Sequence, residues 1–391
     1  MVKVFSALAA AAALSLVAHP AAAQEKLTVG LLTTLSGPAA SLGTQQRNGF
    51  QLAVKTLGNK LGGRDVELVI QDDELKPDVA VTKAKAMVER DKAAFVVGPI
   101  FSNILQAILK PVTDGGAFMI SPNAGTSNFA GKECNANLFV VSYQNDQNHE
   151  VLGKYAQDSG IKKAFIMAPN YQAGKDALAG FKRYFKGEVA GEVYTTINQP
   201  DYSAELAQLR AARPDALYVF YPGGMGVNFT KQYAQAGLIK EVPFFSAFTI
   251  DSVTLAAIGD AAIGTYGTAF WNTELKNPAN ERFVADFEKK FKYTPSNYSA
   301  QSYDAALLLD AAIKAVGGKL DDKEALRAQF RKADFKSVRG PFKYNNNNFP
   351  IENFYLHQVV KDSAGKLKLE NRGVVFKDHS DAYAKDCPLK W

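Results

Sequence analysis

Residues 93–126, with the sequence AAFVVGPIFSNILQAILKPVTDGGAFMISPNAGT, contain two short apolar runs on either side of a helical segment. The runs at 94–97 and 117–120 are four residues long and are bounded by Gly and Pro. Such runs are typical of strands that are buried on both faces of a parallel sheet. Together with a helix expected over 104–113, they predict a β-α-β unit.

A small, polar cluster follows each apolar run: GPIFSN at 98–103 and SPNAGT at 121–126. A third cluster of this kind, LSGP, lies at 35–38. In open α/β sheets the ligand binds at the carboxyl ends of the strands, and free N–H groups at a helix start favour an anion such as a carboxylate. A single cluster is more often ordinary turn chemistry, but three of them favour a binding site.

Strands and helices alternate along the first part of the chain, which predicts a parallel sheet with right-handed crossovers. Beyond the two runs above, the expected elements are strands at 27–34 and 66–71 and helices at 45–57 and 79–90. The run at 138–142 should leave this lobe. A second series then begins, with strands at 164–167, 189–195, 216–221, 243–246 and 263–270 and helices at 147–158, 173–185, 203–212 and 226–236. This restart predicts a second α/β lobe.

The later segments are expected to return to the first lobe and then finish the second. Helices at 280–291, 299–316 and 322–332 should cover the first lobe, and 340–344 and 354–360 should pair around a turn at 345–348. We therefore predict two Rossmann-like three-layer αβα lobes joined by a multi-strand hinge. The expected limits are 24–142 plus 273–337 for lobe one, 143–272 plus 338–360 for lobe two, and a C-terminal tail at 361–391.

The first 23 residues read as a secretory signal peptide, with Lys3, an apolar run at 4–17 and small residues at 21–23. A single uncleaved membrane anchor is the competing interpretation. No later segment approaches the ~18 apolar residues of a membrane span. The mature chain would have 391 − 23 = 368 residues, enough for two large lobes. We expect an exported, periplasmic protein.

The charge and the cysteines limit the partners and cofactors. The formal net charge of +6 is spread among acids without a basic arm, so nucleic acid is not an expected partner. Cys134 and Cys387 are the only cysteines, and in an exported protein such a pair reads as one disulfide. Metal binding would need further ligands, and the mature chain has only His149, His357 and His379. We expect no metal and no cofactor.

Several segments in this order and spacing resemble the leucine/isoleucine/valine-type solute-binding proteins of ABC transporters, which have the type I periplasmic-binding-protein fold. The segments are GLLTTLSGP (30–38) with Gly43, GFQLAV (49–54), GGR (62–64), Asp72 and Asp73 with Pro77, VGP (97–99) with Ser102, ISP (120–122), DYS (201–203) and the stretch from Tyr298 to Asp304. The resemblance covers nearly the whole mature chain. It implies a two-lobed clamp that closes on a small ligand and delivers it to the transmembrane subunits of an ABC permease.

The resemblance also implies where a ligand would be held. The positions that match the family's carboxylate grip are Ser102 and the turn formed by Ala124, Gly125 and Thr126. A hydroxyl and a few N–H groups are enough to hold a carboxylate without a buried Arg. Further candidates from the clusters and the helix at 299–316 are Ser36, Asn123 and Gln301.

The chain departs from the amino-acid-binding relatives at the position of the acid that pairs with the ligand's ammonium group. Alignment places Phe248 there, and the nearest acid is Asp251. An ammonium buried without its carboxylate costs ~3–5 kcal/mol. Phe101, Tyr171, Tyr221 and Phe248 would instead form a flat apolar slot. These residues favour a small aromatic carboxylate, benzoate-like or hydroxycinnamate-like, over a branched-chain or other neutral amino acid.

Two other classes of protein remain as alternatives. An enzyme is disfavoured because the sequence has no nucleophile elbow, HExxH pair, P-loop or dinucleotide-binding fingerprint. A sensor that presents its ligand to a receptor is the other alternative. We expect a monomer that binds a small carboxylate and docks on a permease.

Overall fold

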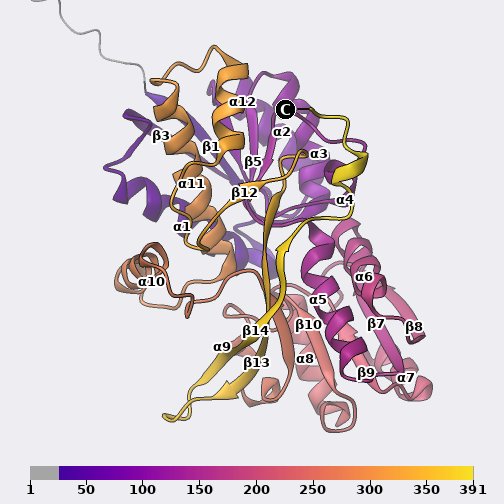
Figure 1. The fold of residues 1–391 in the computed structure, drawn as a ribbon. Coiled ribbons are helices and arrows are strands. Elements are labelled where there is room, and N and C mark those ends of the chain that lie inside the picture. The colour runs from indigo at the N-terminus through magenta and orange to yellow at the C-terminus, as the bar shows by residue number, and fades with distance from the viewer. Residues whose placement is uncertain (1–25, 391) are drawn as a thin grey trace, which may run out of the picture.

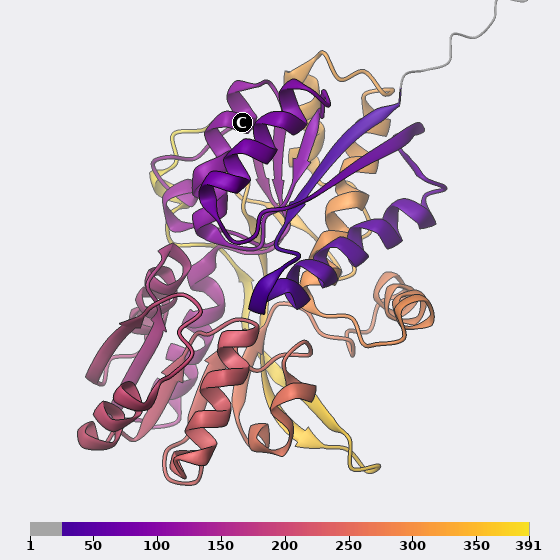
Figure 2. The same cartoon turned by 180° about the vertical axis from the view of Figure 1, so that it is seen from behind.

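The structure is a computed structural model that describes residues 26–390, so the predicted signal peptide lies outside the described residues. The chain forms two α/β lobes, one above the other in Figure 1. Seen from behind, the early part of the chain forms most of the upper lobe and the middle part forms the lower lobe (Figure 2). Within residues 26–390, none of the helices combines the length and the apolar character needed to cross a bilayer.

The first lobe contains a six-stranded sheet in the order β2-β3-β1-β4-β5-β6. Its strands are β1 (Leu27–Thr33), β2 (Lys60–Leu61), β3 (Arg64–Asp72), β4 (Phe95–Val97), β5 (Phe118–Ser121) and β6 (Leu138–Val140). All neighbours are parallel except β2 and β3. Every residue of β4 and β5 is buried, as expected for short apolar strands at the centre of a sheet. The β-α-β unit predicted at 94–120 is confirmed.

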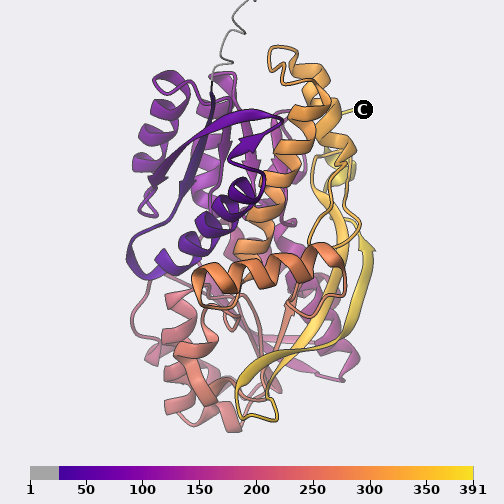
Figure 3. The same cartoon turned by 90° about the vertical axis from the view of Figure 1, so that its left-hand side faces the viewer.

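Helices from two distant parts of the chain are associated with the first lobe. They are α1 (Ala40–Thr56), α2 (Pro77–Glu89), α3 (Ser102–Asp114), α4 (Ser127–Ala130), α10 (Pro278–Phe291), α11 (Asn297–Ala315) and α12 (Lys323–Lys332), with a 3₁₀ turn at Gly37–Ala39. Helix α11 runs beside α1 (Figure 3), and a Cβ on Gly49 would lie 2.1 Å from the carbonyl oxygen of Ser299. In α12, Phe330 packs 4.9 Å from Phe139 of β6, measured between ring centroids. The expected return of the late helices to the first lobe is therefore observed.

The second lobe contains an eight-stranded sheet in the order β12-β13-β11-β10-β9-β7-β8, with β14 paired to β13. Its strands are β7 (Lys163–Pro169), β8 (Glu188–Thr195), β9 (Ala216–Val219), β10 (Phe244–Ala247), β11 (Tyr266–Ala269), β12 (Lys343–Tyr344), β13 (Pro350–Lys361) and β14 (Leu367–His379). Its helices are α5 (Asn145–Asp158), α6 (Gln172–Tyr184), α7 (Ser203–Ala212), α8 (Gly224–Gln235) and α9 (Leu255–Ile258), with 3₁₀ turns at Leu238–Lys240, Gly259–Ala262 and Ala384–Asp386. The strands from β7 to β11 are parallel. The chain thus has the two-lobed α/β architecture that its sequence predicts.

The C-terminal segment is more regular than the polar tail predicted from residue 361 onward. Strand β14 pairs antiparallel with β13, and their connection forms the hairpin at the bottom of Figure 1. The sequence signal was weak because β14 carries charged side chains and is only partly buried, as is common in edge strands. The turn predicted at 345–348 is observed, but β12 pairs with Pro350 and Ile351 at the start of β13. The expected partner segment, 354–360, pairs with β11 and β14 instead.

The chain crosses between the lobes after β6, after β11 and after α12, which agrees with a multi-strand hinge. The residue limits given for each lobe stay a prediction. The expected disulfide joins Cys134 to Cys387 across a sequence separation of 253 residues. It ties the end of the chain to the first lobe, and closure of so long a loop is worth ~3–5 kcal/mol in the chain-entropy model.

Candidate functional site: a pocket between the lobes

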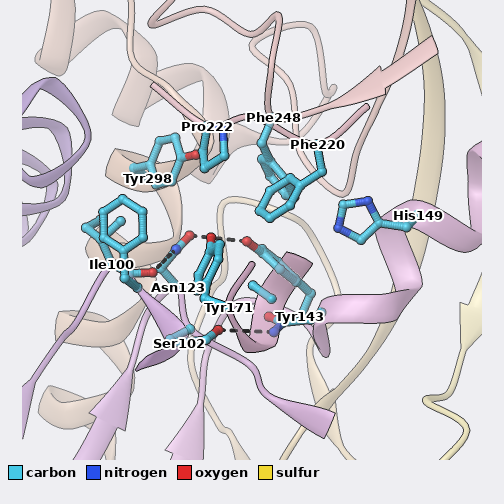
Figure 4. A pocket seen from close by; sticks show the side chains of 14 residues that line it. Ile100, Ser102, Asn123, Tyr143, His149, Tyr171, Phe220, Pro222, Phe248 and Tyr298 are labelled. Carbon is cyan, nitrogen blue, oxygen red and sulfur yellow. Dashed lines mark hydrogen bonds between the residues drawn. The ribbon is translucent and has the colours of Figure 1, made fainter. Parts of the chain in front are cut away.

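A small pocket lies where the carboxyl ends of the two sheets face each other. Figure 4 shows the side chains that surround it. They are Ile100, Phe101, Ser102, Asn123, Ala124, Tyr143, Asn145, His149, Tyr171, Ala173, Phe220, Pro222, Phe248 and Tyr298. Aromatic rings and uncharged polar groups therefore make up most of the wall.

The β-α-β pattern places these side chains. Ile100, Phe101 and Ser102 follow β4, and Asn123 follows β5. In the second lobe, Tyr171 follows β7, Phe220 follows β9 and Phe248 follows β10. Because these strands are parallel within each sheet, their following loops meet at one edge. Two helices also begin at the pocket: α3 starts at Ser102 and α6 starts just before Ala173. The first N–H groups of a helix have no intrahelical partner, so both starts favour an anion.

Ser102 is oriented as a hydrogen-bond donor into the pocket. Its Oγ accepts a hydrogen bond from Nδ2 of Asn145, at 3.1 Å. The amide of Asn145 is itself oriented, because its Oδ1 accepts from the N–H of Gly125 at 3.1 Å. Since Ser102 Oγ accepts from Asn145, its own hydrogen is available to a ligand oxygen.

Asn123 holds the strand ends together. Its Nδ2 donates to the carbonyl oxygen of Ile100 at 2.6 Å. Its Oδ1 accepts from Nε2 of Gln301 at 2.6 Å and from the Tyr143 hydroxyl at 3.3 Å. The amide of Asn123 is thus largely occupied by protein partners, and its main role here is to position the loops after β4 and β5.

Aromatic rings from both lobes form a continuous wall. Phe101 of the first lobe lies 6.0 Å from Tyr171 of the second, and Tyr171 is stacked 6.3 Å from Phe220, measured between ring centroids. Phe248 is stacked on Tyr143 at 5.2 Å. Phe248 also has a φ of +59°, which is unusual for a bulky residue and is found at functional sites. The wall has the shape and chemistry of a slot for a flat ring.

The pocket wall is uncharged among the described residues, since no Asp, Glu, Lys or Arg lines it. Burial raises the pKa of the Tyr171, Tyr143 and Tyr298 hydroxyls, so all three stay protonated at neutral pH. Burial lowers the pKa of His149 to about 3, so its imidazole stays neutral. The site offers neutral donors and helix N-termini to an anion, and its described lining residues offer no carboxylate to a cation.

Asp251, the nearest acid to Phe248 in sequence, does not line the pocket. Its Oδ1 accepts from the backbone N–H groups of Val253 and Thr254 at 2.8 and 3.0 Å. These bonds hold the carboxylate in its own turn. No acidic side chain among the pocket residues could therefore pair with an ammonium group.

The structure brings six of the predicted ligand-binding residues to the pocket: Phe101, Ser102, Asn123, Ala124, Tyr171 and Phe248. Their contact with a ligand stays a prediction.

Five other predicted residues lie outside the lining. Ser36 is exposed and bonds to Asp72. The backbone N–H of Gly125 donates to Oδ1 of Asn145, and Nε2 of Gln301 donates to Oδ1 of Asn123. Thr126 is buried at the N-cap of α4. Tyr221 turns into the core of the second lobe, where its hydroxyl bonds to Thr195 at 3.1 Å and its ring packs on Tyr202 and Phe229.

Eight lining residues were not predicted from the sequence: Ile100, Tyr143, Asn145, His149, Ala173, Phe220, Pro222 and Tyr298. Phe220 and Pro222 flank Tyr221. The segment predicted to reach the pocket therefore does so, but through the two neighbours of the predicted residue. Tyr143, Asn145 and His149 follow the first crossing between the lobes. A crossing segment must pass beside an interlobe cleft, and that signal could have pointed to them.

This fold and pocket define a two-lobed protein that holds a small ligand between its lobes. The family model for periplasmic binding proteins matches residues 26–366, so the chain belongs to the periplasmic binding protein family. Membership implies an exported protein, and the family is one of solute-binding proteins and not of enzymes. Within residues 26–390 there is no group of His, Cys, Asp and Glu side chains suited to a metal ion.

Relatives cover nearly the whole chain. Leu/Ile/Val-binding protein homolog 6 of Brucella melitensis is 28% identical over 92% of this chain and 94% of its own length. A solute-binding protein of an ABC transporter from R. palustris, solved with benzoate, is 34% identical over 93% of this chain and 100% of that chain, with a TM-score of 0.87. Another from Rhodopseudomonas palustris BisB5, solved with 3,4-dihydroxybenzoic acid, is 29% identical over 91% of this chain and 99% of that chain, with a TM-score of 0.84.

Proposed function

We propose that this chain is the periplasmic solute-binding protein of an ABC uptake transporter and that it closes on a small aromatic carboxylate, benzoate-like or hydroxycinnamate-like. The observation that carries the proposal is the composition of the pocket. Aromatic rings from both lobes line the pocket, neutral hydrogen-bond donors reach into it, and none of its described lining residues is charged. The similar proteins solved with benzoate and 3,4-dihydroxybenzoic acid support the same ligand class.

In this proposal the carboxylate binds Ser102 and the N-termini of α3 and α6. Hydrogen bonds from neutral groups to a carboxylate are charge-assisted and strong, and the helix ends add favourable electrostatics. The ring then lies between Phe101, Tyr171, Phe220 and Phe248. Burial of a ring with an area of ~150–250 Å² contributes roughly 4–6 kcal/mol.

Binding draws the lobes together because the ligand contacts both of them. Ser102 belongs to the first lobe, while Tyr171, Phe220 and Phe248 follow strands of the second. A ligand stabilises the closed form by its differential contacts in that form. The closed protein, a monomer after removal of residues 1–23, would then dock on the permease.

A branched-chain or other neutral amino acid is the second candidate, favoured by the names of the Brucella relatives. It is the weaker one, because its ammonium group would find no acidic partner among the lining residues. A role as a ligand sensor uses the same pocket and would differ only in the docking partner.

Isothermal titration calorimetry tests the proposal. The mature protein is titrated with benzoate, 4-hydroxybenzoate, cinnamate and 4-coumarate, and with leucine and valine as the comparison set. We expect saturable binding of at least one aromatic acid and much weaker binding of both amino acids. Tight binding of leucine or valine with none by the aromatic acids would overturn the proposal.

A further inference from the structure

His149 lies in the pocket wall but takes no part in the proposed grip on the carboxylate. It belongs to α5 and is 1% exposed. Its Nδ1 is hydrogen-bonded to the hydroxyl of Tyr218 in β9. Its ring packs edge-on against Phe220 at 5.0 Å and against Phe248 at 6.3 Å. A polar side chain is thus built into the aromatic part of the pocket (Figure 4).

The bond to Tyr218 selects one tautomer of the imidazole. Tyr218 is fully buried and stacks on Phe181, and the one hydrogen-bond partner of its hydroxyl among residues 26–390 is His149. If Nδ1 were the donor, the phenol hydrogen would lack an acceptor in the core, which is unfavourable. With Tyr218 as the donor both groups are satisfied, and the imidazole hydrogen is on Nε2.

The second ring nitrogen is then an unused donor. Nδ1 is directed at Tyr218, and within the described residues no hydrogen bond is made by Nε2. The ring nevertheless lines the pocket. Burial keeps the imidazole neutral by lowering its pKa to about 3, so Nε2 offers one N–H without a charge.

We propose that His149 determines ligand specificity by donating a hydrogen bond from Nε2 to an oxygen atom on the ring of the bound aromatic acid. The inference rests on the proposed function and deepens it. With the carboxylate at Ser102, the ring lies beside Phe220 and Phe248, the two rings that His149 contacts. A hydroxyl, methoxy or carbonyl oxygen on that part of the ring would accept the hydrogen, whereas an alkyl group of the same size would leave it unpaired. The preferred class is therefore an oxygen-substituted aromatic carboxylate.

Matched ligands test this contact without a change of size. The dissociation constants of methoxybenzoate and ethylbenzoate are measured by calorimetry as 3-substituted and 4-substituted pairs, with benzoate as reference. For at least one pair we expect the wild type to prefer methoxy about tenfold, because one buried donor gains or loses its acceptor.

Two variants separate the two imidazole nitrogens. The amide of His149→Asn reaches only the position of Nδ1, so the methoxy preference should fall to within about twofold. The amide nitrogen of His149→Gln reaches the position of Nε2, so most of the preference should remain. Nitrogen-15 NMR of the unmodified protein should show the hydrogen on Nε2, and this measurement needs no variant.

Three outcomes would overturn the inference. The first is equal affinity for methoxy and ethyl ligands in the wild type while benzoate binds, which leaves the proposed function intact. The second is a hydrogen on Nδ1. The third is a methoxy preference that His149→Asn retains in full. Failure of benzoate and of every substituted acid to bind overturns the proposed function and this inference together.

Discussion

Ser127 donates two hydrogen bonds to the carboxylate of Asp176: its Oγ lies 2.6 Å from Oδ1 and its backbone nitrogen 3.2 Å from Oδ2. Ser127 belongs to α4 of the first lobe and Asp176 to α6 of the second. The pair can therefore keep these bonds only while the lobes are closed. Asn145 connects the pair to the pocket, because its Nδ2 donates both to Asp176 at 2.8 Å and to Ser102 at 3.1 Å.

Asp176→Asn should weaken ligand binding although residue 176 does not line the pocket. An Asn amide cannot accept from Ser127, Gln172 and Asn145 as the carboxylate does, and hydrogen bonds to a charged group are worth ~1.5–3 kcal/mol. We expect at least a tenfold rise in Kd for benzoate by calorimetry. The exposed acid Asp158 provides the control, since Asp158→Asn should leave Kd unchanged. An unaltered Kd in Asp176→Asn would mean that the Ser127–Asp176 contact does not stabilise the closed form.

Ser102→Ala should lower affinity selectively for carboxylates. The change removes the hydroxyl that Asn145 orients toward the pocket. We expect Kd for benzoate to rise about tenfold to a hundredfold, because a donor to a charged oxygen is lost. Kd for the neutral amide benzamide should change by less than about threefold. Equal losses for both ligands would show that the substitution acts through packing and not through the carboxylate.

Phe248→Leu should reduce the preference for an aromatic ring. Phe248 is stacked on Tyr143 at 5.2 Å and is buried, and aromatic pairs contribute about 0.5–1.5 kcal/mol beyond their area. We expect benzoate to lose about twofold to tenfold in affinity while cyclohexanecarboxylate changes little. The check is the ratio of the two dissociation constants in wild type and variant. A constant ratio would show that the Phe248 ring does not select for aromaticity.

The lobe-one part of the pocket was the most predictable from sequence. Short apolar runs fix where β4 and β5 end, and the residues after a parallel strand lie at the ligand edge by topology alone. The positions of Phe101, Ser102 and Asn123 at the pocket are therefore predictable from where these two strands end. The same topology predicts that residues after β9 reach the ligand edge, but the strand ends at Val219 and not at Tyr221. Because side chains alternate along an extended chain, Phe220 faces the pocket and Tyr221 the core.

The residues of the crossing segment carry no local signal and are predictable only from the place where the chain crosses between the lobes. Tyr143, Asn145 and His149 are brought to the pocket by the packing of two lobes on each other, which no local pattern encodes. Strand β14 is not predicted by the sequence pattern, because an exposed edge strand needs no apolar run. The aromatic character of the site, in contrast, is predictable from Phe101, Tyr171 and Phe248 in the sequence.

Arg339 joins the segments that cross between the lobes, and its removal should destabilise the whole protein. Its guanidinium pairs with Asp304 at 3.1 Å and Glu352 at 2.7 Å, donates to the carbonyl oxygen of Ser142 at 2.9 Å, and lies 5.3 Å from the ring of Phe270. All three side chains are nearly inaccessible to solvent, and burial raises the pKa of Asp304 and raises that of Glu352 to about 8. Arg339→Met would leave two buried acids without their cation, at a cost of up to ~3–5 kcal/mol.

Urea unfolding measures this cost. The control is Arg90→Met, because Arg90 pairs with Asp91 at the surface, where such pairs contribute about 0–1 kcal/mol. Unfolding midpoints that fall equally in the two variants would contradict the role assigned to Arg339.

Asp251 should make the protein less stable as the pH rises from 4 to 7. Burial raises the pKa of Asp251 from 3.8 to about 6, so the folded state holds this proton more tightly than the unfolded chain does. The stabilising contribution of protonation is complete below pH ~4 and is lost as the pH rises through about 6. A difference of two pKa units corresponds to ~3 kcal/mol.

Asp251→Asn removes the charge but keeps an oxygen that can accept from Val253 and Thr254. We expect the variant to have a larger free energy of unfolding than the wild type at pH 7, by about 1–3 kcal/mol, and no such advantage at pH 4. Urea titrations at pH 4, 5, 6 and 7 give the difference, with Asp114→Asn at an exposed ion pair as the reference variant. If the advantage grew toward acid pH instead, the Asp251 carboxylate would be stabilised by its turn more than burial destabilises it.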